Sequence, residues 1–275
     1  MPLFLTSLRH VAAAAPGIAL TALAAMLAGC TLLPWAAAPD APSQVSRLLP
    51  ADLVVLGEQH DVPEHHVIER DTVLALARSG RLAALAIEMA EEGQGTTYLK
   101  PDATEAQVQT ALSWNDKAWP WADYGPAIMA AVSAGVPVIG ANLPRERMKD
   151  AMADVSLDAQ LGDAQRAQQQ QAVRDGHCGL LPETQIVPMT RIQIARDRAM
   201  AQVALKARVP GKTVLLIAGA GHATKTLGVA QHLPTDLRVK SIRLVAGEAD
   251  HAPGYDVLWR TPALPEKDYC ASLRK

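Results

Sequence analysis

A chain of 275 residues, of which 49% are hydrophobic and 20% are charged, is long enough for one large domain with a sizeable core, or for one domain with a small insert. Its formal net charge is −2. No long basic run is present, which argues against nucleic acid as a partner and against binding to anionic lipid through a basic segment.

The amino-terminal segment has the pattern of a bacterial lipoprotein signal. A charged start precedes an apolar run over residues 11–28, and the motif LAGC ends at Cys30. This ending resembles the lipobox, which implies cleavage before Cys30 and lipid on its thiol. Because Thr31 follows and not aspartate, the lipoprotein is expected at the periplasmic face of the outer membrane. The alternative is a plain membrane span, which the short run and the motif disfavour.

Three segments follow from this interpretation. Residues 1–29 are the predicted signal peptide, residues 30–47 a semi-stiff tether rich in proline and alanine, and residues 48–275 the folded domain. If Cys30 carries lipid, Cys178 and Cys270 remain. In an oxidising periplasm these two cysteines either pair in a disulfide or stay as thiols, and the sequence gives no distance that decides between the two states.

Five short apolar runs predict an α/β fold with a mostly parallel central sheet flanked by helices. They are rich in Val, Ile and Leu, as strands that are covered on both faces should be. Helical patterns separate the first strands, which indicates right-handed crossovers. The predicted strands are 53–56, 84–87, 137–139, 214–218 and 239–244, and the predicted helices between the first three of them are 64–79, 103–113 and 123–134.

The region 143–208 breaks this alternation. It has no strand pattern and is far longer than one crossover needs. Helices are predicted over 145–153, 158–174 and 188–208. We therefore expect a helical subdomain inserted between the third and fourth strands, where it could close over the strand ends as a lid.

Polar side chains follow four of the predicted strands, at the point where each strand ends. Any one of them could merely cap a helix or pack in the core. Together they suggest one site, because the carboxyl ends of parallel strands meet at the same edge of a sheet. The residues are Glu58, His60 and Asp61 after the first strand, Glu88 after the second, Asn142 after the third, and His222 after the fourth.

Two chemical roles are open for this set. Two carboxylates and two imidazoles could bind a divalent metal such as Zn or Mn and activate water, with Glu58, His60, Glu88 and His222 as the ligands. They could instead form a polar rim that orients a large ligand. The spacing does not match HExxH or another strong zinc motif.

An aromatic cluster lies within eleven residues of a chain that is only 4% aromatic. It consists of Trp114, Trp119, Trp121 and Tyr124. The cluster is either local core or the wall of a pocket for a flat, apolar ligand, with Trp121 as one contact. A tyrosine phenolate can bind ferric haem iron, which makes Tyr124 a candidate.

Further candidate ligand-binding residues fit a haem. Arg145 and Arg147 could bind the propionates, or lie on an exposed helix face. Asn142 and His65 lie near the expected cleft, and His177 lies in the helical region. No CxxCH motif occurs, which excludes covalent c-type haem.

The order of these motifs resembles the ChaN-like haem-binding lipoproteins, within a superfamily that includes Tiki proteases and erythromycin esterases. The resemblance implies an α/β sheet with a helical subdomain, a lipid anchor, and a role in haem or iron acquisition. The wider superfamily implies a metal site made of Glu58, His60, Glu88 and His222. The matching segments are GEQHD with PEHH (57–66), AIEM at the second strand end, W…WPW…YGP (114–126), GANLPRE (140–146), IQIARDRAMA (192–201) and GAGH (219–222).

Two functions follow as hypotheses. The first is a membrane-anchored lipoprotein that binds haem, alone or between two copies in a homodimer, for periplasmic haem and iron uptake. The alternative is a metal-dependent hydrolase of a peptide, an ester or an envelope component, in which Glu58 or Glu88 is the general base.

Overall fold

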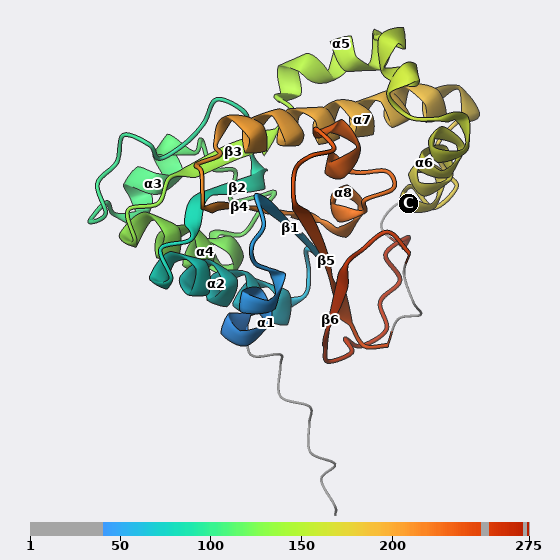
Figure 1. Cartoon of the computed structure of the whole chain (residues 1–275). Helices are drawn as coiled ribbons and strands as arrows, with labels where there is room; N and C mark the ends of the chain where they lie inside the picture. Colours follow the sequence, from blue (N-terminus) through green and yellow to red (C-terminus); the bar gives the residue numbers. More distant parts are fainter. Residues whose placement is uncertain (1–40, 249–252, 272–273, 275) are drawn as a thin grey trace, which may run out of the picture. The chain divides into compact units, whose positions relative to one another are not determined.

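The computed structural model of this chain describes residues 41–248, 253–271 and 274, which form a sheet between layers of helices (Figure 1). Six strands pair in parallel in the order β3-β2-β4-β1-β5-β6. The strands are β1 (Leu53–Glu58), β2 (Leu82–Glu91), β3 (Val138–Asn142), β4 (Thr213–Gly219), β5 (Val239–Ala246) and β6 (Val257–Thr261). The five predicted strands and the parallel α/β sheet are confirmed.

The sixth strand, β6, was not predicted from the sequence. It lies at the edge of the sheet, where only one neighbour pairs with it. Its burial alternates, with Trp259 buried and Arg260 exposed. An edge strand of this kind lacks the continuous apolar run that marks a central parallel strand.

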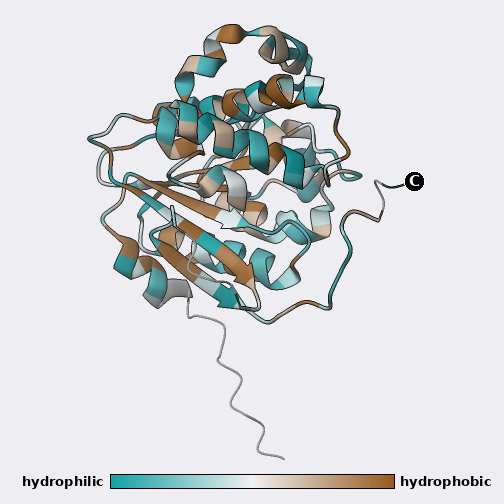
Figure 2. Ribbon diagram, turned by 90° about the vertical axis from the view of Figure 1, so that its right-hand side faces the viewer, coloured by the Kyte–Doolittle hydropathy of each residue, from teal (hydrophilic) through white to brown (hydrophobic). Residues whose placement is uncertain are grey.

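Each face of the sheet packs against its own helices. Val54 and Leu56 face the helices α1, α2 and α4, whereas Leu53 and Val55 face α7, because successive side chains of a strand point to opposite faces. In Figure 2 the strands in the middle are largely brown with some teal stretches, and the helices around them carry many teal residues. The helices are α1 (Ala41–Leu48), α2 (Pro63–Arg78), α3 (Glu105–Ala111), α4 (Trp121–Ser133), α5 (Met148–Ala153), α6 (Asp163–Gly176), α7 (Glu183–Lys206) and α8 (Ala220–Ala223), with short 3-10 helices η1 (Arg145–Arg147), η2 (Val155–Gln160) and η3 (Val229–His232).

The end of the predicted tether belongs to the folded domain, which corrects the expected boundary near residue 48. Residues 41–48 form helix α1, and its Val45 and Leu48 are 3% and 6% exposed in the core. Their spacing of three residues is helical, but the surrounding proline and alanine hid it. The predicted signal peptide, residues 1–29, and the predicted lipidation site, Cys30, lie outside the described residues.

Helices occupy the region between β3 and β4, as the sequence predicted. Part of this region has a small apolar core of its own, which includes Leu157, Leu161 and Ile194. The second half of α7 packs on the sheet instead, through Met200 and Val203. This half of α7 is therefore the crossover helix, and the inserted part is confined to η1, α5, η2, α6 and the start of α7.

The carboxyl-terminal segment is fastened to the domain. Cys178 and Cys270 form a disulfide between Cα atoms 5.8 Å apart, which settles the pairing that the sequence left open. Lys267 and Tyr269 both bind the carboxylate of Asp61, at 2.7 and 3.2 Å. Asp61 follows β1, so this segment passes close to the strand ends.

Among the described residues, no helix has both the length and the apolar character that a membrane crossing requires.

Candidate functional site

The polar residues after the strands meet at one edge of the sheet. Glu88 of β2 accepts a hydrogen bond of 2.7 Å from the backbone N–H of Gly219, where the neighbouring β4 ends. His222, in α8 just beyond, has its Nε2 3.5 Å from Oε1 of Glu88. The side-chain amide of Asn142 donates to the carbonyl of Glu88 at 2.9 Å. Three strands thus contribute to one cluster around Glu88.

His60 joins this cluster to the end of β1. Its Nδ1 lies 2.9 Å from Oε1 of Glu58, and its imidazole is 40% exposed. A Cβ atom on Gly219 would lie 2.9 Å from Nε2 of His60 and 3.6 Å from Oε2 of Glu88. The absence of a side chain on Gly219 therefore leaves room for the ring of His60 beside Glu88. Burial alone would lower the pKa of His60, but the hydrogen bond and charge of Glu58 raise it above its ordinary value.

A buried ion triad lies on the α7 side of the cluster. Nδ1 of His222 is 2.7 Å from Oδ1 of Asp197, which α7 supplies, while Nε2 faces Glu88. Burial alone would lower the pKa of His222, but Glu88 and Asp197 raise it to about 10. Burial alone would raise the pKa of Glu88, but protonated His222 holds it well below its usual range. These shifts favour an imidazolium at His222 between Glu88 and Asp197, while burial, as the largest effect, raises the pKa of Asp197.

Asp197 was missed in the sequence as a site residue. It lies within the segment IQIARDRAMA, on a helix whose other buried residues are almost all apolar. Its side chain is 2% exposed. A charged residue on the buried face of a helix is the one signal that could have identified it.

Tyr124 lies beneath the site and not at its surface. The ring is 3% exposed in α4, and its hydroxyl donates to Oε1 of Glu58 at 3.1 Å. Burial, followed by the charge of Glu58, raises the pKa of Tyr124 far above its ordinary value. This environment disfavours the phenolate that ferric iron would need. The hydroxyl of Tyr124 contacts Glu58 instead.

A cleft of about 410 Å³ opens beside these strand ends. Trp119 forms part of its wall and contacts the edge of His60, with ring centroids 4.9 Å apart. Trp121 packs against Trp114 instead, and its indole N–H donates to Glu105 at 2.8 Å. The aromatic cluster therefore presents Trp119 to the cleft, whereas Trp121 is not among the lining residues. Among the others that line it are Glu88, Met89, Leu112, Asn142, Arg145, Met148 and Arg196.

Two predicted ligand-binding histidines do not line this cleft. His65 is fully buried in α2, and its Nδ1 accepts the backbone N–H of Gln59 at 3.0 Å. Burial lowers its pKa to about 4. His177 caps the end of α6, with Nδ1 2.7 Å from the carbonyl oxygen of Val173. Both imidazoles have local structural partners.

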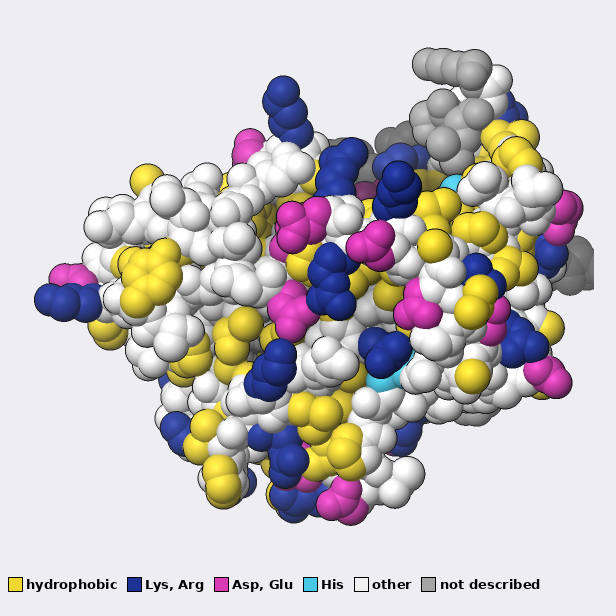
Figure 3. Space-filling view, turned by 90° about the horizontal axis from the view of Figure 1, so that it is seen from above, with side chains coloured by type: hydrophobic (Ala, Val, Ile, Leu, Met, Phe, Trp, Pro, Cys, Tyr) yellow, Lys and Arg dark blue, Asp and Glu magenta, His cyan; other side chains and the backbone are white. Residues whose placement is uncertain are grey.

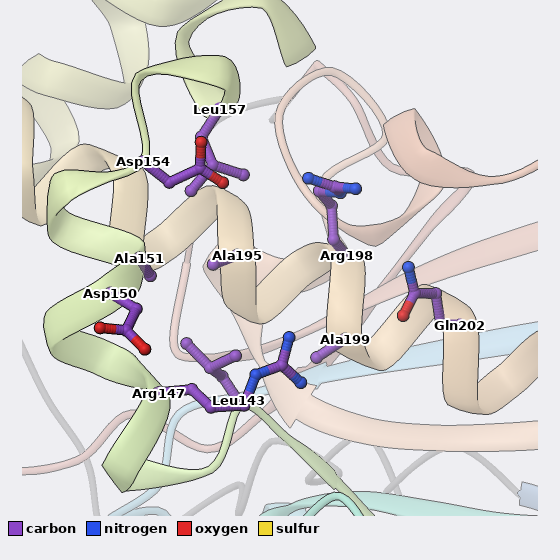
Figure 4. A pocket seen from close by; sticks show the side chains of 10 residues that line it. All are labelled: Leu143, Arg147, Asp150, Ala151, Asp154, Leu157, Ala195, Arg198, Ala199 and Gln202. Carbon is purple, nitrogen blue, oxygen red and sulfur yellow. The ribbon is translucent and has the colours of Figure 1, made fainter.

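A second cavity of about 470 Å³ lies between α5 and α7 (Figure 4). Its lining combines alanine and leucine side chains with the charged side chains of Arg147, Asp150 and Arg198. Leu143 lines both this cavity and the cleft beside Trp119.

On the face seen in Figure 3, basic and acidic side chains are interspersed, so neither sign of charge dominates there.

A further cluster lies behind Glu58. Among the described residues, Glu58, His66 and Glu69 form the group of possible metal ligands whose donor atoms all lie within 4.8 Å of one another. This group shares only Glu58 with the predicted set Glu58, His60, Glu88 and His222. Burial and the charge of Glu58 raise the pKa of Glu69 well above its ordinary value.

The His222 triad predicts a loss of stability in alkaline solution. The histidine pKa is raised on folding, so its contribution is complete below about pH 6.5 and is lost as the pH rises through about 10. We expect the free energy of unfolding, measured by urea denaturation at a series of pH values, to fall between about pH 6.5 and about pH 10. The same titration with His222→Gln should lack this fall, and an unchanged free energy in the parent protein would contradict the ion triad.

The chain resembles known proteins in sequence and in fold. A family model described as haem-binding uptake, Tiki superfamily, ChaN, matches residues 44–233. The structure resembles that reported as cofacial heme binding to ChaN of Campylobacter jejuni, with a TM-score of 0.62, 24% identity, and coverage of 76% of this chain and 87% of that chain. The type III effector HopBA1 is more distant, with a TM-score of 0.46, 16% identity, and coverage of 82% and 94%. No functionally curated protein matches the sequence.

Proposed function

Because the chain belongs to the haem-binding uptake family of the Tiki superfamily, ChaN, we propose that it binds haem and serves haem and iron uptake. The observation that carries this proposal is the family match over residues 44–233. That range contains the whole strand-end cluster and the cleft beside Trp119.

The proposed haem site is the cleft beside Trp119. A flat porphyrin favours an aromatic wall and apolar contacts, which Trp119, Leu112 and Met148 supply. The guanidinium groups of Arg145 and Arg196 line the same cleft and suit the propionates as charge-assisted donors. Arg147, which the sequence also suggested, lines the neighbouring cavity between α5 and α7.

The proposed iron ligand is His60, which is not itself a lining residue of the cleft but packs against its wall residue Trp119. Its Nδ1 is held by Glu58, and its Nε2 has no hydrogen-bond partner among the residues that the structure describes. A carboxylate on the second ring nitrogen fixes the tautomer and raises the basicity of a metal-binding imidazole. The hydroxyl of Tyr124 donates to the same oxygen of Glu58 and so helps to hold the carboxylate that orients His60.

The proposed location rests on the sequence. The motif LAGC supports a lipid on Cys30, and with it attachment to the periplasmic face of the outer membrane. A homodimer that holds haem between two copies is part of the same proposal, since the C. jejuni ChaN structure is described by cofacial haem binding. Mass spectrometry of the membrane-extracted protein would detect the lipid, and light scattering with added hemin would report the dimer.

The hydrolase alternative is not favoured by the family membership. It required Glu58 or Glu88 as a general base beside a metal. Glu88 is instead paired with His222 and the N–H of Gly219. A divalent metal at Glu58, His60, Glu88 and His222 remains a hypothesis, which titration of the metal-free protein with Co²⁺ tests.

Replacing Trp119 with alanine should weaken hemin binding, and replacing Trp121 should not. Loss of a large apolar contact costs about 1.5–3 kcal/mol, which corresponds to a dissociation constant roughly 10–100-fold higher. Titration of the purified protein with hemin, followed by the shift of the Soret band, measures this constant. Trp121→Ala is the matched control because its indole packs away from the cleft.

Two results would contradict the proposed site. If the unsubstituted protein gives no Soret shift at micromolar hemin, the chain does not bind haem. If Trp119→Ala and Trp121→Ala weaken binding equally while both variants stay folded, the cleft beside Trp119 is not the haem site.

A further inference from the structure

The inner cluster, defined as Glu58, His66 and Glu69, has the composition of a metal site. Nδ1 of His66 lies 3.3 Å from Oε2 of Glu69 and 3.5 Å from Oε2 of Glu58. Ligand atoms bound at about 2.1 Å to one ion are separated by no more than about 4 Å. His66 and Glu69 are one helical turn apart on α2, and Glu58 ends the adjacent strand β1, so regular structure on two elements holds the three donors.

The two carboxylates of the inner cluster are buried and incompletely paired. Glu58 is 2% exposed and Glu69 is fully buried. Oε1 of Glu58 contacts His60 and Tyr124, but its Oε2 has no hydrogen-bond partner in the described structure, and the same is true of Oε1 of Glu69. A buried oxygen without a partner costs free energy, so an additional group that binds both carboxylates would stabilise the cluster.

A cation between Glu58 and Glu69 would supply a partner for carboxylate oxygens that lack one. Burial and the charge of Glu58 favour a proton on Glu69, and a divalent ion that displaces this proton would neutralise both carboxylates. Carboxylate and imidazole donors together suit first-row transition metals such as Zn or Mn. No lysine or arginine is paired with Glu58 or Glu69 among the ion pairs of the described residues.

A cavity lies beside His66 of this cluster. A small cavity of about 180 Å³ between α2 and α4 is lined by His66, Arg70, Asp123 and Pro126, among others. The charge of Arg70 is taken up by Asp71 at 2.8 Å, whereas Asp123 adds a carboxylate to the cavity. His66 thus stands between this cavity and the two buried glutamates, on a side distinct from the cleft beside Trp119.

We propose that Glu58, His66 and Glu69 bind one divalent transition-metal ion, separately from haem. Glu58 links the two sites, because its Oε1 contacts His60 and its Oε2 faces His66. The metal would therefore fix the carboxylate that orients His60. This site does not depend on whether the cleft beside Trp119 takes haem.

Cobalt is a suitable probe, because Co²⁺ replaces Zn²⁺ and its visible absorption reports the ligands. The full chain, stripped of metal, is titrated with Co²⁺ in the absence of hemin, and the stoichiometry is checked by elemental analysis after dialysis. We expect one equivalent to bind. Glu69→Gln should weaken binding by more than the roughly 10–100-fold that loss of a second-shell partner costs. Asp102→Asn, which removes an exposed carboxylate outside the cluster, should bind Co²⁺ as the parent does.

Glu88→Gln separates the inner cluster from the strand-end set. Retained Co²⁺ binding in Glu88→Gln, together with its loss in Glu69→Gln, supports the proposal. Loss in Glu88→Gln with retention in Glu69→Gln would place the metal at the strand ends and overturn it, as would loss in both folded variants. Absence of Co²⁺ and Zn²⁺ binding in the parent protein would also overturn it. If Glu69→Gln does not fold, His66→Gln takes its place. Titration of each variant with hemin measures haem binding separately, so failure of the metal proposal can be told apart from failure of the haem proposal.

Discussion

Asp197→Ala is expected to lower the free energy of unfolding by about 3–5 kcal/mol at neutral pH. The substitution removes one partner of a buried ion pair and leaves the imidazolium of His222 with Glu88 alone. Both Asp197 and His222 are more than nine-tenths buried, so water cannot replace the lost carboxylate. Urea denaturation monitored by circular dichroism measures this change.

Two further variants sharpen the result. Asp175→Ala removes an exposed aspartate at the end of α6 and should change stability by no more than about 0.5 kcal/mol. Asp197→Asn keeps the shape of the side chain but removes its charge, so the pKa of His222, followed by NMR, should fall from about 10. A stability of Asp197→Ala equal to that of the parent would show that His222 is not charged in the folded protein.

Gly140→Ala is expected to destabilise the protein by about 3 kcal/mol, at the upper end of the cost of overpacking. A Cβ atom on Gly140 would overlap the carbonyl oxygen of Glu91 and lie 2.9 Å from the carbonyl carbon of Ala90. These are backbone atoms of the neighbouring strand, which cannot move aside as a flexible side chain can. The clash arises where the pairing of β2 and β3 is irregular, two residues before Asn142.

Gly176→Ala is the matched control. A Cβ atom on Gly176 would meet no atom within 4 Å, and the residue ends helix α6. Alanine favours a helix over glycine by up to about 1 kcal/mol, so this variant should be neutral or slightly more stable. Thermal unfolding of both variants compares them directly. Equal melting temperatures for Gly140→Ala and the parent would mean that β2 and β3 are not packed as described.

The strands and their shared edge were predictable from the sequence. A central parallel strand is covered on both faces, so its local apolar run is sufficient to identify it, as for β1 and β4. Parallel pairing then brings the carboxyl ends together, which is why Glu88 and His222 could be expected to meet. The edge strand β6 and helix α1 escaped prediction, because half-buried elements leave a weaker local pattern.

The partners of the site residues were decided by tertiary structure. A helical spacing shows that His66 and Glu69 share a face of α2, but not that this face meets Glu58. Local sequence also does not reveal that Asp197 turns toward His222, that Trp119 and not Trp121 reaches the cleft, or that Cys178 lies beside Cys270. Periodicity along a chain sets which residues are buried, whereas the packing of distant elements sets what each buried group touches.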